Sequence, residues 1–380
     1  MPRVFRRASP NTISTMLLIN NDQVKQLLTP RMTIDALRAA YVDLANGDAV
    51  CRPRIDIRIP AAAPEHVYQW GSMEGGSVRG YFAVRMKSDV LIEMEYNGVR
   101  TQEKFAQKPG LYCGLIFLTS IETAEPLAII NDGHLQHMRV AADGALGTDI
   151  MARKNCTTLG MLGSGEMARA HVESLLQVRD IRRMKVFSPT PANRERFAAE
   201  MREKFSIDVE VCADARDVYV GADLLAACTD SVVPVIRGEW LEPGMHVISI
   251  GGRPDAAADA RFDVVLRLGV SPAPLGRPDL GTADEFLGYV AQPDHPIWRK
   301  VKGGKPARGP ASRGSNVMYA DVLAGRANAR ASDSQITYSE RGNIQGAQFY
   351  AVAGAVYEAA VRARIGREIP TDWFLQDIRD

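Results

Sequence analysis

Residues 163–168 read Gly-Ser-Gly-Glu-Met-Ala and match the G-x-G-x-x-A pattern of a dinucleotide-binding turn. An apolar stretch with strand character precedes the turn, and residues 167–177, with helical character, follow it. In such a unit the first glycine permits the tight turn, and the second lets the backbone approach a pyrophosphate that the helix N-terminus attracts. An ordinary strand–helix turn is the alternative, although the context favours a nucleotide site. The predicted site residues are Gly163, Gly165, Glu166, Met167 and Ala168.

The end of the next strand bears on which dinucleotide would bind. A site that prefers NAD has an acidic residue there, which bonds to the ribose hydroxyls. This chain reads VFSPTPANRER instead, with Ser188 at the expected position and Thr190 and Arg194 close behind. Two hydroxyls and a guanidinium suit a 2′-phosphate, so the sequence favours NADP over NAD. The alternative is that Ser-Pro-Thr only forms the turn.

Three segments ahead of this unit each place a cation beside a predicted core. Alternation in CRPRIDIRIP and in GYFAVRMKSDV sets Arg54 and Lys87 on polar strand faces. In HLQHMRVAADGALGTDI, Arg139 falls on the apolar stripe of a helix, where an unpaired buried charge is very costly. A small carboxylate substrate would satisfy these cations, because arginine forks grip carboxylate oxygens. The alternatives are a solvated polar face for the strands and an internal ion pair for Arg139.

Loop aspartates are further candidates. Asp230, Asp255 and Asp259 lie in loops after strands that end near Thr229 and Gly252, at the carboxyl edge where a parallel sheet binds cofactor and substrate. Solvated turn residues are the alternative. His134 and His137 lie three residues apart at a helix start, but no cysteine or carboxylate cluster accompanies them, so we expect no metal site.

The elements that must position these residues differ between two parts of the chain. Residues 51–132 contain five strand-like segments joined by short turns, which suggests a mostly antiparallel sheet. From Cys156 onward apolar strands alternate with helical or loop segments, the pattern of a doubly wound parallel sheet in an α/β protein. A last helix is predicted at 348–366.

Composition narrows the possible partners and surroundings. The 380-residue chain has 46 Lys and Arg against 45 Asp and Glu, which gives no reason to expect a nucleic acid or an anionic membrane as partner. No apolar run approaches the roughly 20 residues of a membrane span. Five cysteines without a CxxC pair favour a reducing, cytoplasmic location. The basic stretch 299–313 is interpreted as a solvated insert rather than a phosphate site, and the basic N-terminus as a frayed tail.

Taken together, the motifs resemble the ornithine cyclodeaminase/mu-crystallin family over nearly the whole chain. The landmarks, besides the Gly-rich turn, are LANGDAVCRPR (44–54), VRMKSD (84–89), HMRVAAD (137–143), ACTDSVVPV (227–235), EWLEPGMHVISIGG (239–252) and DVLAGRANARASDSQITYS (321–339). The resemblance implies an α+β substrate-binding and dimerisation domain, residues 1–145 plus 330–380. A Rossmann-type NAD(P)-binding domain, residues 146–329, is inserted in it.

The resemblance also implies roles for matching residues. Arg54, Lys87 and Arg139 would grip the substrate carboxylate, with Lys87 also near the reacting carbon, and Thr229 and Ser231 would lie along the cofactor. The implied protein is a homodimeric NAD(P)-dependent oxidoreductase that acts at the Cα–N bond of an amino acid or a (cyclic) imino acid. It would be an imine or ketimine reductase, or an amino-acid dehydrogenase.

Two departures from the family pattern keep alternatives open. Cyclodeaminases have an aspartate directly after the Gly-Gly of the strand end, where this chain has Arg253, with Asp255 two residues further on. The Ser-x-Gly turn before the last helix is replaced by residues 339–342, Ser-Glu-Arg-Gly. One alternative is an ornithine- or lysine-type cyclodeaminase with no net redox change, in which Asp255 would act as the catalytic acid. The other is a binding protein that holds nucleotide and a small acid without turnover.

Overall fold

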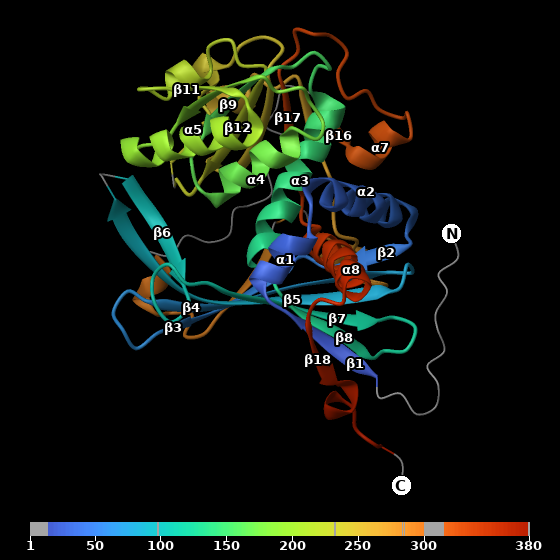
Figure 1. Cartoon of the computed structure of the whole chain (residues 1–380). Coiled ribbons are helices and arrows are strands. Elements are labelled where there is room, and N and C mark those ends of the chain that lie inside the picture. Colours follow the sequence, from blue (N-terminus) through green and yellow to red (C-terminus); the bar gives the residue numbers. More distant parts are fainter. Residues whose placement is uncertain are drawn as a thin grey trace.

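The computed structural model describes residues 14–378 apart from 97–98, 232, 283, 285 and 300–314. The basic N-terminal tail before residue 14 and, except for Arg299, the basic stretch 299–313 therefore lie outside the described residues. Figure 1 shows two sheets that lie one above the other, with helices between them. Among the described helices, none is long and apolar enough to cross a membrane.

The lower sheet of Figure 1, here called the first sheet, has the strand order β15-β3-β4-β5-β7-β8-β1-β18, with β2 paired to β4 and β6 to β5. Strands β3, β4, β5, β7 and β8 are antiparallel neighbours, as their short connections predict, whereas β15 and β1 are added in parallel. The strands are β1 (Thr15–Ile19), β2 (Ala49–Cys51), β3 (Arg54–Pro60), β4 (Val67–Ser77), β5 (Tyr81–Tyr96), β6 (Val99–Phe105), β7 (Cys113–Ser120), β8 (Pro126–Asn131), β15 (Phe286–Val290) and β18 (Arg367–Pro370).

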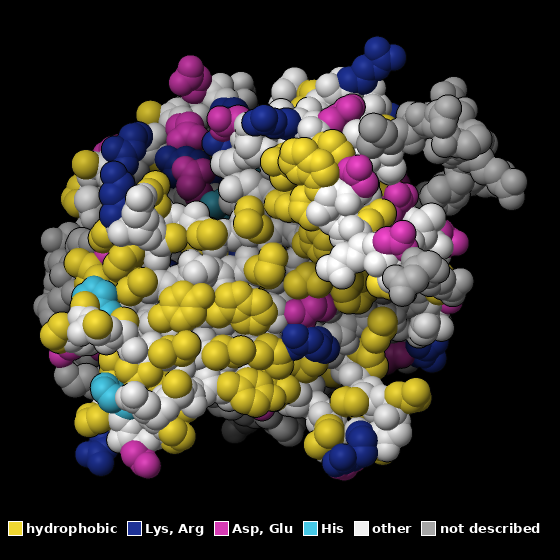
Figure 2. Space-filling model, turned by 90° about the horizontal axis from the view of Figure 1, so that it is seen from below, with side chains coloured by type: hydrophobic (Ala, Val, Ile, Leu, Met, Phe, Trp, Pro, Cys, Tyr) yellow, Lys and Arg dark blue, Asp and Glu magenta, His cyan; other side chains and the backbone are white. Residues whose placement is uncertain are grey.

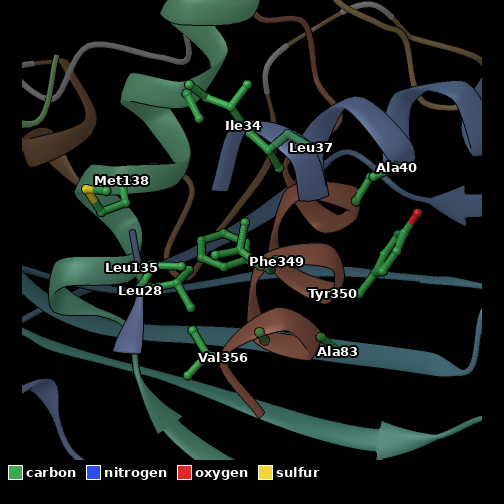
Figure 3. Packing of buried hydrophobic residues seen from close by; sticks show 14 of the residues in the cluster. Leu28, Ile34, Leu37, Ala40, Ala83, Leu135, Met138, Phe349, Tyr350 and Val356 are labelled. Atoms are coloured by element: carbon green, nitrogen blue, oxygen red, sulfur yellow. The ribbon is translucent and has the colours of Figure 1, made fainter. Parts of the chain in front are cut away.

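Helices α1 (Asn21–Leu27), α2 (Pro30–Asn46) and α8 (Gln345–Ala363) cover the upper face of the first sheet (Figure 1). Local sequence sets the ends of α2. The Thr29 side chain accepts a hydrogen bond from the backbone N–H of Met32, Pro30 takes the first helical position, and Gly47 ends the helix at φ 80°. Apolar side chains of these helices and of the sheet interdigitate in one core, as Figure 3 shows around Phe349.

The upper sheet, here called the nucleotide sheet, has the order β11-β10-β9-β12-β13-β17-β14-β16, and its neighbouring strands are parallel. The order reverses between β9 and β12, which is the switch point where doubly wound sheets bind ligands. The predicted α/β fold with a Rossmann-type sheet is confirmed. The strands are β9 (Thr158–Leu162), β10 (Arg183–Phe187), β11 (Asp208–Val211), β12 (Leu224–Thr229), β13 (His246–Gly251), β14 (Val264–Arg267), β16 (Ser315–Met318) and β17 (Thr337–Glu340), and the helices are α4 (Glu166–Leu175), α5 (Pro191–Phe205), α6 (Ala256–Asp259) and α7 (Tyr319–Leu323).

The division into residues 1–145 plus 330–380 and 146–329 remains a proposal, and two strands qualify it. β15 lies in the inserted range but extends the first sheet beside β3. β17 lies in the C-terminal range but pairs between β13 and β14 in the nucleotide sheet. Both strands are short, and distant partners decide which sheet they join, so local patterns do not reveal their membership.

The charged face of the first sheet is covered, and its apolar face is exposed. Asp56 and Lys87 are 0% and 6% exposed, whereas Ile57 and Ile59, on the alternate face of β3, are 39% and 43% exposed. A solvated polar face, the alternative for Arg54 and Lys87, is therefore wrong. Alternation distinguishes the two faces of a strand, but it does not say which face the rest of the chain will cover.

Candidate functional site

The Gly-rich turn has the geometry that a dinucleotide site requires. Gly163 adopts φ 118°, and a side chain there would overlap the carbonyl of Cys228 on β12. A side chain at Gly165 would meet nothing within 4 Å, so the backbone faces open space directly ahead of α4, which begins at Glu166. Ala168 is fully buried on the side of the strand. A pyrophosphate can approach this helix N-terminus, and nucleotide contacts at these residues stay a prediction.

The structure brings together the predicted residues at the end of β10. Ser188 is buried, and its hydroxyl accepts a hydrogen bond from Ser164 of the Gly-rich turn at 2.9 Å. Arg194 lies over the Phe187 ring at 5.4 Å and donates to the Ser188 carbonyl at 3.0 Å. The buried Nε of Arg194 has no partner among the described groups. Thr190 stands at the N-cap of α5 without using its side chain to cap the helix.

The carboxyl ends of β12 and β13 complete this edge. Thr229 pairs with Gly251 in the parallel register, and Gly251 adopts φ 95° where a side chain would overlap the Thr229 carbonyl. The Thr229 hydroxyl accepts a hydrogen bond from the backbone N–H of Ser231 at 3.2 Å. Since β12 also neighbours β9, these residues adjoin the Gly-rich turn. Their predicted place along the cofactor is thus geometrically consistent with the turn.

The contacts of Asp255 stabilise the local fold. Its carboxylate caps α6 by accepting from the backbone N–H of Ala258 at 2.8 Å, and it also accepts from that of Gly238 at 3.0 Å. Arg237 forms an ion pair with it at 3.3 Å. Every one of these partners lies in the segments that flank β13 of the nucleotide sheet, so the described contacts do not connect Asp255 with Lys87 or Arg139.

Glycines make room for charged side chains on the covered face of the first sheet. The register aligns Asp56, Gly71, Lys87 and Gly114 across four neighbouring strands. A side chain at Gly71 would lie 2.7 Å from Lys87 Cε and 2.8 Å from an Asp56 oxygen, and one at Gly114 would overlap Asp132. The missing side chains therefore let these charged groups lie flat over the sheet beneath the helices.

Lys87 and Arg54 lie in this row with carboxylates beside them. Lys87 Nζ donates to Asp89 at 2.8 Å, and Arg54 Nη2 donates to Asp56 at 2.9 Å. Burial lowers the pKa of Lys87 to about 8, and the charge of Lys104 adds to the shift. Lys87 therefore gives up its proton at a lower pH than a solvated lysine does. The charge of Arg54 also acts on Lys87, and the shared role of the two residues in binding a substrate carboxylate stays a prediction.

Arg139 is 2% exposed and lies over the Phe349 ring at 4.7 Å. Its guanidinium donates to the Gln136 side chain at 2.8 Å and also to the side chain of Gln348. Among the described residues no carboxylate lies within ion-pair distance of it, and Asp143, four residues further along the helix, acts on it through its charge alone. Burial lowers the pKa of Arg139 to about 9, and the positive charge of Arg341 adds to the effect.

Sequence reasoning missed the buried network behind Arg139. Tyr41 donates a short hydrogen bond to Asp143, and Gln348 donates to Asp143 at 2.6 Å and to the Tyr41 hydroxyl at 2.9 Å. Burial raises the pKa of Asp143 to about 6. Asp143 follows Arg139 by four residues and therefore lies on the same helix face, which is a signal that the sequence contained.

Arg139 lies on helix α3 (Gly133–Met151), which runs from the first sheet toward the nucleotide sheet (Figure 1). A side chain at Gly144 would lie 3.0 Å from Ile248 of β13, and one at Gly147 would overlap Ser339 of β17. The helix thus packs directly on two strands of the nucleotide sheet. We call the region between the covered face of the first sheet and the carboxyl edge of the nucleotide sheet the seam. Arg54 and Lys87 lie on the first-sheet side of the seam, and the predicted nucleotide edge lies on the other side.

Comparison with known proteins agrees with this arrangement. Residues 95–271 match the model of the ornithine cyclodeaminase/mu-crystallin family. A Delta(1)-pyrroline-2-carboxylate reductase of Bacillus cereus is 32% identical over 138 residues, which are 36% of this chain and 42% of that protein. That alignment therefore spans less than half the length of the relative. An alanine dehydrogenase of Archaeoglobus fulgidus is 25% identical over 358 residues, 93% of this chain and 98% of that one.

A solved structure shares the fold over nearly the whole chain. It is an archaeal alanine dehydrogenase dimer with bound NAD, superposed with a TM-score of 0.70 at 22% identity. The match covers 94% of this chain and 99% of that one. Both sheets therefore recur together in a known architecture.

Proposed function

We propose that this chain, a member of the ornithine cyclodeaminase/mu-crystallin family, is a nicotinamide-dependent oxidoreductase acting at the Cα–N bond of an amino acid or a (cyclic) imino acid. The observation that carries the proposal is Arg139, a buried guanidinium with no carboxylate partner among the described residues. It lies on the helix that joins the cations of the first sheet to the nucleotide edge. An unpaired buried cation at such a place needs an anionic ligand.

Each residue has a distinct part in this proposal. Arg139 holds the substrate carboxylate with its planar fork. Its cation–π contact with Phe349 and the hydrogen bonds that it donates to Gln136 and Gln348 fix the fork in one orientation. Lys87, with a pKa of about 8, holds a positive charge near the carboxylate and the substrate nitrogen. Arg54 strengthens the same field. When bound, the nicotinamide supplies hydride transfer at Cα, while the protein supplies orientation and charge.

The cofactor assignment rests on the Gly-rich turn and on the end of β10. Open space ahead of Gly165 leaves room for a pyrophosphate at the N-terminus of α4. Ser188 and Arg194 lie side by side beyond it without an acidic residue at that strand end, and the buried Nε of Arg194 lacks a partner among the described groups. We therefore favour NADP over NAD.

The alternatives find less support in the site. A cyclodeaminase would need an acid in the seam for its amine and proton transfers, and the Asp255 carboxylate is engaged by Arg237 and two backbone N–H groups of the nucleotide domain. A binding protein without turnover would not consume the cofactor, and the turnover measurement below separates it from the enzyme. We therefore propose a reaction with net oxidation or reduction.

We further propose a homodimer joined through the exposed apolar face of the first sheet. Figure 2, seen from below, shows hydrophobic side chains gathered on this face of the molecule. Ile57, Ile59, Leu115 and Tyr289 belong to it, each at least 38% exposed. Uncovered apolar surface of this kind favours association, and a two-fold pair would cover it. The five free cysteines are in keeping with a cytoplasmic setting, which we also propose.

The test compares the native protein with Arg139→Lys, which keeps the charge and loses the fork. Amino acids and keto acid–amine pairs are supplied with each nicotinamide, and absorbance of the reduced cofactor and release of ammonia are measured in parallel. Native turnover with a net change in cofactor is expected, and kcat/KM should fall by about 10- to 100-fold in the variant, the scale of one charged hydrogen bond. Unchanged cofactor affinity and melting temperature are the controls. Ammonia release without cofactor consumption would establish the cyclodeaminase instead, and a variant with normal kinetics would remove Arg139 from the site.

A further inference from the structure

Arg341 stands at the carboxyl edge of the nucleotide sheet, on a turn that its neighbours hold in place. β17 ends at Glu340, whose carboxylate forms an ion pair with Arg267 at 2.9 Å. Gly342 adopts φ 81°, and a side chain there would overlap the carbonyl of Gly269. The half-buried Arg341 therefore projects from a turn that is anchored on both sides.

The position of this turn brings Arg341 to the seam. The parallel register pairs Ser339 with Ile248, so Arg341 lies beside the end of β13, next to the glycine turn that contacts Thr229. The positive charge of Arg341 adds to the burial that lowers the pKa of Arg139, and it opposes the burial that raises the pKa of Asp143. Its side chain is therefore within electrostatic reach of α3, although it comes from the opposite end of the chain.

The α3 side of the seam has an excess of positive charge. Arg54 and Lys87 on the first sheet each have a carboxylate at hydrogen-bond distance. In the described part of the chain, by contrast, no group forms an ion pair or hydrogen bond with Arg341, and Arg139 bonds only to neutral amides. Among the described residues, Asp143 is the acid whose charge acts on Arg139, and its oxygens accept hydrogen bonds from Tyr41 and Gln348. Two arginines and one carboxylate leave one positive charge uncompensated.

We propose that the substrate is a dicarboxylic amino or imino acid and that Arg341 binds the carboxylate remote from the reacting carbon. This inference rests on the proposed function. An amino acid or iminium with one carboxylate has no net charge, so it would leave the excess charge in place. A second carboxylate gives a net charge of −1, which offsets it, and charged groups removed from water require such compensation.

The reaction balances with this substrate. In the reductive direction the hydride of the reduced nicotinamide adds to the Cα of the iminium, and the electron pair of the C=N bond becomes a lone pair on nitrogen. The product is the dicarboxylic amino acid with oxidised cofactor. Both carboxylates are unchanged, so the remote one serves only in recognition.

Pairs of keto acids with equal carbon number isolate the remote carboxylate. We would compare 2-oxoglutarate with 2-oxopentanoate, and oxaloacetate with 2-oxobutanoate, each with ammonium and reduced cofactor. For the native protein, kcat/KM should favour the dicarboxylic member by about 10- to 100-fold, the effect of one charged hydrogen bond. Arg341→Gln should remove this preference, and Arg341→Lys should keep part of it. Arg277→Gln, which removes an exposed arginine paired with Asp279, is the control and should change nothing.

The outcomes are separable. Equal or better turnover of the monocarboxylic members by the native protein overturns the inference while the proposed function stands. A weaker affinity for the cofactor in Arg341→Gln, with selectivity unchanged, also overturns it, because Arg341 then serves the nucleotide. If no pair is turned over, the proposed function fails. In that case a rise in melting temperature with glutarate that is absent with pentanoate, and lost in Arg341→Gln, still supports the second anion site, and equal effects of the two acids refute it.

Discussion

The surroundings of Lys87 disfavour its charged form. The pH dependence of activity therefore tests its role. Burial and the charge of Lys104 lower its pKa to about 8 while Asp89 holds the amine in place. Because the pKa is lowered, the proton leaves as the pH rises through about 8, and the field that attracts the carboxylate weakens. We expect kcat/KM to fall on this alkaline limb.

A neighbour of Lys87 supplies the discriminating variant. Lys104 is exposed, and its charge is the second cause of the shift, so Lys104→Met should raise the pKa of Lys87 and move the alkaline limb to higher pH. Lys87→Met should abolish the limb together with most activity. The measurement is the pH profile of kcat/KM for the three proteins, and a limb that stays in place in Lys104→Met would assign it to another group.

Arg194 is the residue on which the cofactor preference turns. NADPH should bind more tightly than NADH, and Arg194→Ala should narrow the gap by about 1–3 kcal/mol, the range of a charge-assisted hydrogen bond. Arg196→Ala, on the same helix but exposed and bonded to Asn193, is the matched control and should leave the gap unchanged. Dissociation constants from fluorescence titration provide the measurement, and equal native affinities for the two cofactors would contradict the assignment.

At the scale of elements, strand β15 contacts the candidate site through the ring of Phe286. It pairs with the edge of β3 and sets Phe286 against the Arg54 guanidinium at 4.5 Å. A cation–π contact contributes about 0.5–2 kcal/mol, so Phe286→Ala should raise KM for the acid by roughly 2- to 30-fold as Arg54 gains freedom. Phe286→Tyr keeps an aromatic face and should retain native KM. Steady-state kinetics of both variants check this, and a normal KM in Phe286→Ala would show that Arg54 does not depend on β15.

Elements also mark the limit of sequence-based prediction here. The Gly163 turn was predictable because strand, turn and helix are encoded within one short unit, and Arg139 was found on a buried stripe for the same local reason. Which face of the first sheet is covered depends in part on α8, which packs on β4 and β5 and lies far from both strands in sequence. The places of β15 and β17, and hence of Arg341, likewise depend on distant pairing.

For the molecule as a whole, the exposed apolar face of the first sheet predicts a dimer in solution. Burying an isoleucine contributes about 1.5–3 kcal/mol, and a charge introduced there would also lose its water, so Ile57→Lys should give monomers. Val220→Lys alters a residue of the nucleotide domain that is 53% exposed, and it should leave the dimer intact. Light scattering at micromolar concentration measures the mass. A native monomer would contradict the proposal, and so would a dimer that survives Ile57→Lys.

Because α3 is one uninterrupted helix, it sets the distance between the two sides of the seam. Gly147 follows Arg139 by eight positions, which corresponds to a rise of about 12 Å in a regular helix. Each residue also turns the helix by about 100°, so the angular phase of Arg139 relative to β17 is set by the same count. The close contacts of Gly144 with β13 and of Gly147 with β17 fix the C-terminal part of this helix on the nucleotide sheet. A single helix therefore fixes the position of Arg139 relative to the edge of the nucleotide sheet. Bending this helix would break its backbone hydrogen bonds.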